Sequence, residues 1–138
     1  MSEPLPGAHG LLDTSVVIAL DVLTPEQLPE EPSICALTLA ELAAGPLATD
    51  DEHERARRQD RLQRVEALLD PLPFDAAAAR AYGRVFAATQ AADRKPRGAR
   101  AVDLMIAAVA LAQGLPLFTR NPQDVDHLRS VGLDVRAV

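Results

Sequence analysis

The chain has 138 residues and a formal net charge of -6, with 48% hydrophobic and 25% charged residues. These values fit one globular domain that buries roughly two thirds of the surface its unfolded chain exposes. The negative charge argues against a broad basic face for nonspecific nucleic-acid binding. The absence of Trp and an aromatic content of 3% argue against base-stacking platforms.

The sequence pattern predicts neither a signal peptide nor a membrane-spanning helix. The first ten residues, MSEPLPGAHG, lack the basic start and apolar core of a signal peptide, so we expect a flexible lead before a single domain over residues 11–138. The longest uncharged stretch, 104–119, is broken by Gly114 and Pro116 and is too short to span a bilayer. Cys35, in an apolar run, is expected to be buried, which fits a reducing cytoplasm.

The first half of the chain predicts two buried strands and two helices. Apolar β-branched residues over 11–20 predict a strand whose C-terminal end carries Asp13, Thr14 and Ser15, and residues 33–37 predict a second strand. Thr38 is the expected N-cap of a helix that stops at Gly45-Pro46.

The polar stretch 50–70 predicts a long helix on the surface. Its expected ion pairs are Glu54 with Arg58 and Asp60 with Arg64, each four residues apart. The apolar positions that should face the core are Leu62, Val65, Leu68 and Leu69.

The second half continues the alternation of strands and helices. Residues 71–74 predict a short strand, after which Asp75 caps a helix. The inward stripe of that helix should be Ala78, Tyr82, Val85, Phe86 and Thr89. An almost wholly apolar helix over 101–113 should end at Gly114 and lead into a strand over 115–119.

Near the C-terminus, Asn121-Pro122 predicts the start of a short helix, and residues 133–138 predict an edge strand. Strands that alternate with helices favour a parallel sheet with helices on both faces. The sequence therefore predicts an α/β domain with about four or five central parallel strands.

Three carboxylates stand in the most apolar segments: Asp13, Glu41 and Asp103. Burying an isolated carboxylate is costly unless it is paired, hydrogen-bonded or bound to a cation. Since all three lie far apart in sequence on apolar elements, we expect the fold to collect them around a divalent ion. Hard oxygen ligands of this kind suit Mg²⁺ or Mn²⁺.

Local structural roles compete with this interpretation. Thr38 and Glu41 have the spacing of a capping box, and Asp103 could stabilise a helix start, each about as well as a metal role explains them. Asn121 and Asp124 fit the capped first turn of a helix better than a metal site. Asp13, inside an apolar strand, has no cap to fill, and an aspartyl-phosphate phosphatase would need a second Asp where Ser15 stands.

Other chemistries have less support. His9, His53 and His127 lack the spacing of metal ligands and are expected at the surface. No phosphate-binding glycine loop or serine-hydrolase elbow is present. Six basic residues and one acid, Asp93, occupy positions 80–100, and this local positive charge beside Asp103 suits a phosphate ligand; the six are Arg80, Arg84, Arg94, Lys95, Arg97 and Arg100.

Four blocks in order along nearly the whole chain carry a family resemblance: LLDTSVVIAL, TLAEL at 38–42 with Gly45, ARAVDLMIAAVAL and LFTRNPQD. Together they resemble the PIN domain, specifically VapC-type toxin ribonucleases. The resemblance implies a three-layer α/β domain and a Mg²⁺- or Mn²⁺-dependent endoribonuclease that hydrolyses structured RNA such as tRNA or rRNA. It also implies a homodimer and inhibition by a cognate VapB-like antitoxin.

The resemblance assigns roles to particular residues. Asp13, Glu41 and Asp103 correspond to the acidic metal ligands, and Thr14 or Ser15 to a supporting hydroxyl. Asn121 stands where many relatives have a fourth acid, and Asp124, one turn on, could restore that charge. As a separate hypothesis, not carried over from the family, Arg97, Arg100 and Arg120 would position the RNA backbone without reading its sequence.

A second function from a different class remains open: a PIN fold with weak or lost turnover that binds RNA or a protein partner. The net negative charge and Asn121 are the observations that favour it.

Overall fold

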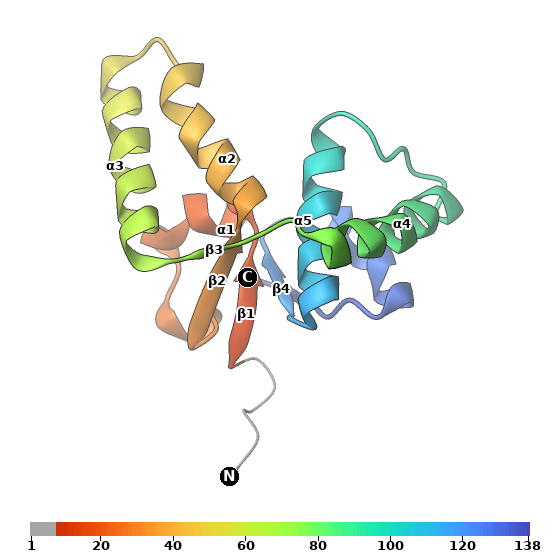
Figure 1. Ribbon diagram of the computed structural model, residues 1–138. Helices are drawn as coiled ribbons and strands as arrows, with labels where there is room; N and C mark the ends of the chain where they lie inside the picture. The colour runs from red at the N-terminus through yellow and green to blue at the C-terminus, as the bar shows by residue number, and fades with distance from the viewer. Residues whose placement is uncertain (1–7) are drawn as a thin grey trace.

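The computed structural model describes residues 8–138, apart from the side chain of Ala99, and its centre is one parallel sheet (Figure 1). The strands are β1 (His9–Leu12), β2 (Glu31–Cys35), β3 (Pro71–Leu72), β4 (Leu117–Thr119) and β5 (Val135–Ala137). Their spatial order is β3-β2-β1-β4-β5, and each neighbouring pair runs parallel. The predicted α/β class with a parallel sheet is confirmed.

Helices cover both faces of the sheet, in three layers. They are α1 (Thr14–Ile18), α2 (Ala36–Ala44), α3 (Glu52–Leu68), α4 (Ala76–Ala91) and α5 (Ala99–Gln113). In Figure 1, α2 and α3 lie on one side of the sheet, whereas α4 and α5 lie on the other. Short 3₁₀ turns complete the chain: η1 (Leu20–Val22), η2 (Pro25–Gln27), η3 (Gly45–Ala48), η4 (Pro122–Asp124) and η5 (Asp126–Val131).

Two hydrophobic cores follow from the alternation of side chains along the strands. On β1, Leu11 packs into the core under α4 and α5, and its neighbour Leu12 packs into the core shared with α1 and α3. The α5 helix is buried over most of its length, as its apolar sequence predicts. Gly10 is required where β1 passes β4, because a Cβ there would lie 2.4 Å from the Phe118 ring.

The start of the domain differs from the sequence prediction. Residues 1–7 of the expected lead lie outside the described part of the chain, and His9 and Gly10 already belong to β1. The apolar run over 11–20 is not one strand, because the Asp13 carboxylate accepts the Val16 N–H and turns the chain into α1. Asp13, expected to have no cap to fill, is thus the N-cap of α1. Val16 and Val17, whose side chains are buried, therefore belong to the helix α1 and not to a strand.

Two helices also begin earlier than predicted. β2 continues directly into α2 with Cys35 at the N-cap, so Thr38 lies inside the helix and forms no capping box with Glu41. The α5 helix begins at Ala99, which places Asp103 in its second turn. The capping explanations for Glu41 and Asp103 were therefore wrong.

Other expected features are confirmed. Asp75 caps α4, and Gly114 ends α5 in the left-handed conformation, at φ 66°. Cys35 is buried, α2 ends before Gly45-Pro46, and β5 is an edge strand. By contrast, Leu68 of α3 is 79% exposed and Phe86 of α4 is 37% exposed, so neither faces the core as expected.

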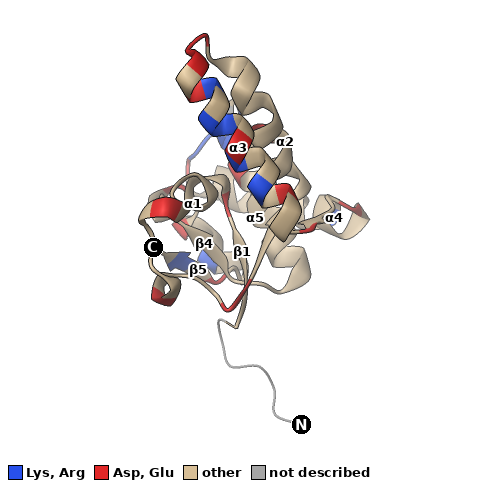
Figure 2. Cartoon of the chain, turned by 90° about the vertical axis from the view of Figure 1, so that its left-hand side faces the viewer, with Lys and Arg blue, Asp and Glu red and all other residues tan. Residues whose placement is uncertain are grey.

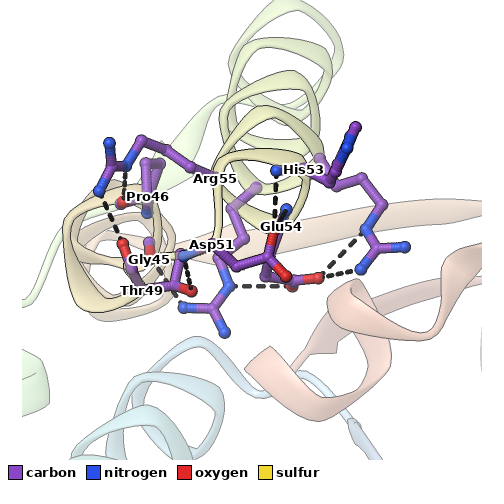
Figure 3. A network of polar contacts seen from close by, with 9 residues as sticks. Gly45, Pro46, Thr49, Asp51, His53, Glu54 and Arg55 are labelled. Atoms are coloured by element: carbon purple, nitrogen blue, oxygen red, sulfur yellow. Dashed lines mark hydrogen bonds and ion pairs between the residues drawn. The ribbon is translucent and has the colours of Figure 1, made fainter.

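The α2 and α3 helices form an arm. Figure 2 shows that acidic and basic residues are interspersed along α3. Both predicted ion pairs of α3 are present, at 3.0 Å for Glu54–Arg58 and 2.6 Å for Asp60–Arg64. At the end of the arm, arginines of α3 donate to carbonyl oxygens just after α2 (Figure 3). No helix among residues 8–138 has the length and apolarity needed to cross a bilayer.

Candidate functional site

The carboxyl ends of β1 and β4 meet at the point where the strand order reverses, which is where open α/β sheets bind ligands. A small pocket of about 30 Å³ lies there, with room for about two water-sized ligands. Its walls are Asp13, Ser15, Asp103, Leu117, Thr119, Asn121, Asp124 and Val125. Four of the five predicted catalytic residues thus line one pocket.

Asp13 is held in place by its local structure. Its carboxylate accepts the Val16 N–H at 3.1 Å and the Ser15 hydroxyl at 2.5 Å. The Ser15 oxygen in turn accepts the backbone N–H of Arg120 at 3.1 Å. This chain of hydrogen bonds joins the end of β1 to the end of β4.

Glu41 reaches the same region from α2. The Thr14 hydroxyl donates to Glu41 Oε1 at 2.6 Å, which ties the helix to the residue after Asp13. Glu41 is exposed and does not line the pocket, but its negative charge acts on Asp103. The fold therefore gathers all three predicted acids at one end of the sheet.

Asp103 shows the electrostatic character of the pocket. Burial and the negative charges of Glu41, Asp13 and Asp124 raise its pKa to about 6, against a partial opposing effect of Arg100. Several carboxylates with little positive charge between them favour a bound cation.

The fourth position of the acidic set lies in the turn after β4. Asn121 occupies the N-cap position of η4, but its side chain caps nothing, and its backbone N–H donates to Thr119 Oγ1 at 3.0 Å. The predicted N-cap position of Asn121 is therefore confirmed, but the capping hydrogen bond expected of its side chain is not formed. Asp124 lines the pocket with a half-buried side chain, and Arg94 supports this turn by donating to the Gln123 carbonyl at 2.8 Å.

The predicted phosphate-binding arginines differ in position. Arg100 is close enough to lower the pKa of Asp103, and Arg120 is exposed directly beside the pocket wall at Asn121. Arg97 is exposed in the loop before α5.

A metal ion is compatible with this donor set. Within residues 8–138, no three Asp, Glu, His or Cys side chains form a ready-made metal cage. Mg²⁺ commonly uses one or two carboxylates and retains several waters, so a complete cage is not needed. Oxygen donors from Asp13 and Asp103, in a pocket whose negative charge raises a carboxyl pKa, fit such an ion.

Two contacts between distant residues were not predicted from the sequence, one beside Glu41 and one away from the pocket. Thr38, read as a cap, is fully buried and lies 3.1 Å from the Thr14 hydroxyl. His127, expected at the surface, is half-buried with Nε2 at 2.9 Å from the Thr89 hydroxyl, and burial lowers its pKa. The partners in these contacts are 24 and 38 residues apart, so no local sequence pattern predicts the contacts.

A second, larger groove of about 850 Å³ lies between α3 and the segment from α1 to the start of β2. Its lining is mostly apolar and includes Val17, Ile18, Leu28 and Leu68, with Arg57, Asp60, Arg61 and Arg64 of α3 among its charged residues. Ile18 is 50% exposed and Leu68 79% exposed, and exposed apolar side chains grouped in one groove favour a binding partner.

Comparison with known proteins agrees with this geometry. Residues 10–129 match the PIN domain family. The chain is similar to Ribonuclease VapC5 of Mycobacterium tuberculosis, with 38% identity over 83% of this chain and 84% of the relative. It is also similar to Ribonuclease VapC8 of the same organism, with 35% identity over 73% of this chain and 89% of the relative.

A solved structure of VapBC-5, a member of the VapBC family of toxin-antitoxin systems from Mycobacterium tuberculosis, has the same fold. The match has a TM-score of 0.83 and 35% identity, and it covers 95% of this chain and 99% of the other. Fold, acidic pocket and sequence similarity agree, and the chain therefore belongs to the PIN domain family and, within it, to the VapC toxin ribonucleases.

Proposed function

We propose that this chain is a Mg²⁺- or Mn²⁺-dependent endoribonuclease that hydrolyses phosphodiester bonds in structured RNA, tRNA or rRNA, as the toxin of a toxin-antitoxin pair. The observation that carries the proposal is the convergence of Asp13, Asp103 and Asp124 on one pocket at the switch point of the sheet. The names of the relatives, both ribonucleases, support the reaction class.

Each residue at the pocket has a distinct role in the proposed reaction. Asp13 and Asp103 would hold the metal, with Glu41 as a third ligand directly or through water, and Asn121 or Asp124 would orient a water at the pocket. A bound Mg²⁺ would supply an activated water and neutralise charge on the phosphate. Ser15 and Thr14 keep the carboxylates of Asp13 and Glu41 in place through hydrogen bonds.

Positive charge for the RNA backbone would come from Arg97, Arg100 and Arg120. Their contacts would position the substrate without reading its sequence, and each would weaken as salt increases. The acidic pocket and these basic side chains together suit a phosphodiester bridged by a cation.

A direct test is incubation of antitoxin-free protein with total tRNA and with rRNA in Mg²⁺ or Mn²⁺. We expect discrete cleavage products that vanish with EDTA and in Asp13→Asn and Asp103→Asn variants. Asp60→Asn, which removes an exposed α3 carboxylate away from the pocket, is the matched control and should cleave normally. Folded protein that binds these RNAs in Mn²⁺ without cutting them would instead support the binding module.

We further infer that a VapB-like antitoxin binds this chain, because the similar solved structure is of a toxin-antitoxin family. The apolar groove beside α3 is the proposed docking site for an apolar antitoxin segment, whose acidic and basic flanks would pair with the mixed charges of α3. An Arg or Lys of the antitoxin that reached Asp13 and Asp103 would block the pocket. A homodimer of the toxin completes the proposed assembly, which light scattering of the free and bound forms would measure.

A further inference from the structure

We propose that Thr38 is a positioning residue that fixes the Glu41 carboxylate through the Thr14 hydroxyl. The inference rests on the proposed function, in which Glu41 helps to hold the metal.

Thr38 is a polar side chain with 0% exposure, three residues into α2. A buried hydroxyl is costly without hydrogen-bond partners. Its neighbours are Thr14 Oγ1 at 3.1 Å and the Cys35 sulfur at 3.9 Å. The Thr14 contact crosses from α2 to α1, so the hydroxyl of Thr38 joins two elements that follow different strands.

The direction of these hydrogen bonds follows from the number of hydrogens. An ionised carboxylate only accepts, so Thr14 must use its single hydroxyl hydrogen in the 2.6 Å bond to Glu41 Oε1. Since that hydrogen cannot also be donated to Thr38, we assign the 3.1 Å contact between the two hydroxyls with Thr38 as the donor. Thr38 donates to Thr14, and Thr14 donates to Glu41, in one ordered relay.

Glu41 needs this restraint because it is exposed. A free Glu side chain samples many rotamers, and fixing it on metal binding costs conformational entropy. The buried Thr38 hydroxyl holds Thr14 in the orientation that holds Glu41 before the ion arrives. The expected effect of Thr38 is thus on metal affinity rather than on RNA binding.

The test uses three variants and two measurements. Thr38→Val removes the hydroxyl with little change of shape, Thr38→Ser retains it, and Thr89→Val removes a buried hydroxyl near His127, away from Glu41. Mn²⁺ affinity is measured by calorimetry without RNA, and folding is checked by thermal melting. We expect Thr38→Val to weaken Mn²⁺ binding about three- to tenfold, as the loss of one hydrogen bond predicts. Thr38→Ser and Thr89→Val should bind nearly as wild type does.

A Glu41→Gln background separates positioning from general damage. If Thr38 acts through Glu41, Thr38→Val should add no further loss of Mn²⁺ affinity to Glu41→Gln. Equal losses in Thr38→Val and Thr89→Val, or additive losses in the double variant, would overturn the relay. A wild-type chain that binds no Mn²⁺ and cuts no RNA would overturn the proposed function instead, so the two failures are distinguishable.

Discussion

Asp103 is the residue whose titration reports most directly on the pocket. Its pKa of about 6 arises from burial and from three neighbouring carboxylates that oppose its ionisation. A folded-state pKa above the unfolded value of 3.8 means that the native state retains a proton that the unfolded state releases. Asp103 therefore favours folding below about pH 4, and this contribution is lost as pH rises through about 6.

We expect Asp103→Asn to stabilise the metal-free protein at pH 8 and to have little effect near pH 4. The full shift corresponds to about 3 kcal/mol, and solvent screening at a half-buried site reduces this to about 1 kcal/mol. Chemical denaturation in EDTA across this pH range measures the difference. A variant that is less stable than wild type at pH 8 would show that a partner compensates the negative charge of Asp103, so that its ionised form does not destabilise the fold.

Arg97 and Arg120 lead to a prediction about RNA binding. Each is exposed, so Ala substitution should leave the fold unchanged and remove one phosphate contact. We expect a higher Michaelis constant, a nearly unchanged kcat, and a decrease of about one in the slope of log affinity against log salt. Arg84→Ala, an exposed α4 variant, serves as the control. An unchanged Michaelis constant in both site variants would remove these residues from the RNA surface.

At the scale of single residues, the sequence identified the carboxylates but not what holds them. Asp13, Glu41 and Asp103 stand out because charge in apolar segments is costly, and this rule needs no structure. Thr38 matched a local capping pattern, yet its partner Thr14 lies 24 residues away. Contacts between distant residues depend on how strands pair, which local periodicity does not encode.

At the scale of elements, arginines hold two segments of the chain: the segment after α2 at the end of the arm, and the turn η4 beside the pocket. Arg58 donates from α3 to the Gly45 carbonyl at 2.9 Å, and Arg55 donates to Pro46 and Thr49 (Figure 3). These carbonyls follow the end of α2, where the helix itself leaves oxygens unpaired. On the other side of the sheet, Arg94 similarly holds the turn that carries Asn121 and Asp124.

We expect Arg58→Met to destabilise the arm by about 1 kcal/mol, because the Gly45 carbonyl loses a charged donor. The neighbouring Arg57 pairs with Glu54 alone and is mostly exposed, so Arg57→Met should leave the free energy of unfolding nearly unchanged. Urea denaturation of the two variants measures the contrast. Equal destabilisation would show that the Glu54 ion pairs, and not the carbonyl contact, matter here.

Arg94→Met should loosen η4 without touching the acids. We expect a lower kcat with a small change in RNA affinity, since Asn121 and Asp124 would lose their fixed position. The neighbouring Lys95, exposed in the same loop, provides the Lys95→Met control. A pure effect on the Michaelis constant would mean that Arg94 acts as a phosphate contact.

Element types were largely predictable, whereas their boundaries were not. Asp75, Gly114 and the ion pairs of α3 follow local rules of capping and helical spacing, and they occur as expected. The predicted strand over 11–20 was wrong because apolar β-branched residues fit a buried strand and a buried helix equally well. Only the Asp13 cap, which ends β1 after Leu12, distinguishes the two.

At the scale of the whole molecule, the acidic pocket and the proposed docking groove are separate surfaces. The acidic pocket uses the carboxyl ends of β1 and β4, whereas the apolar groove lies beside α3. We therefore expect a mutation in the groove to weaken partner binding without altering the acidic pocket.

We expect Leu68→Glu to weaken antitoxin binding at least tenfold, because about 1.4 kcal/mol or more is lost when a charge replaces a large apolar contact. Cleavage of RNA by the free toxin should persist. Val22 is 72% exposed and lies outside the groove, so Val22→Glu is the control. Calorimetric titration with the cognate antitoxin decides the matter, and equal affinity for Leu68→Glu and wild type would place the antitoxin elsewhere.

The bond between Ser15 and Arg120 spans 105 positions of the chain. During synthesis, Asp13 and Glu41 emerge long before Asp103, and the β4 edge emerges later still. The pocket can close only after β4 has inserted beside β1, because Asn121 and Asp124 follow that strand. The pocket is therefore incomplete for most of the synthesis of the chain, and it can form only once the segment that follows β4 has been made.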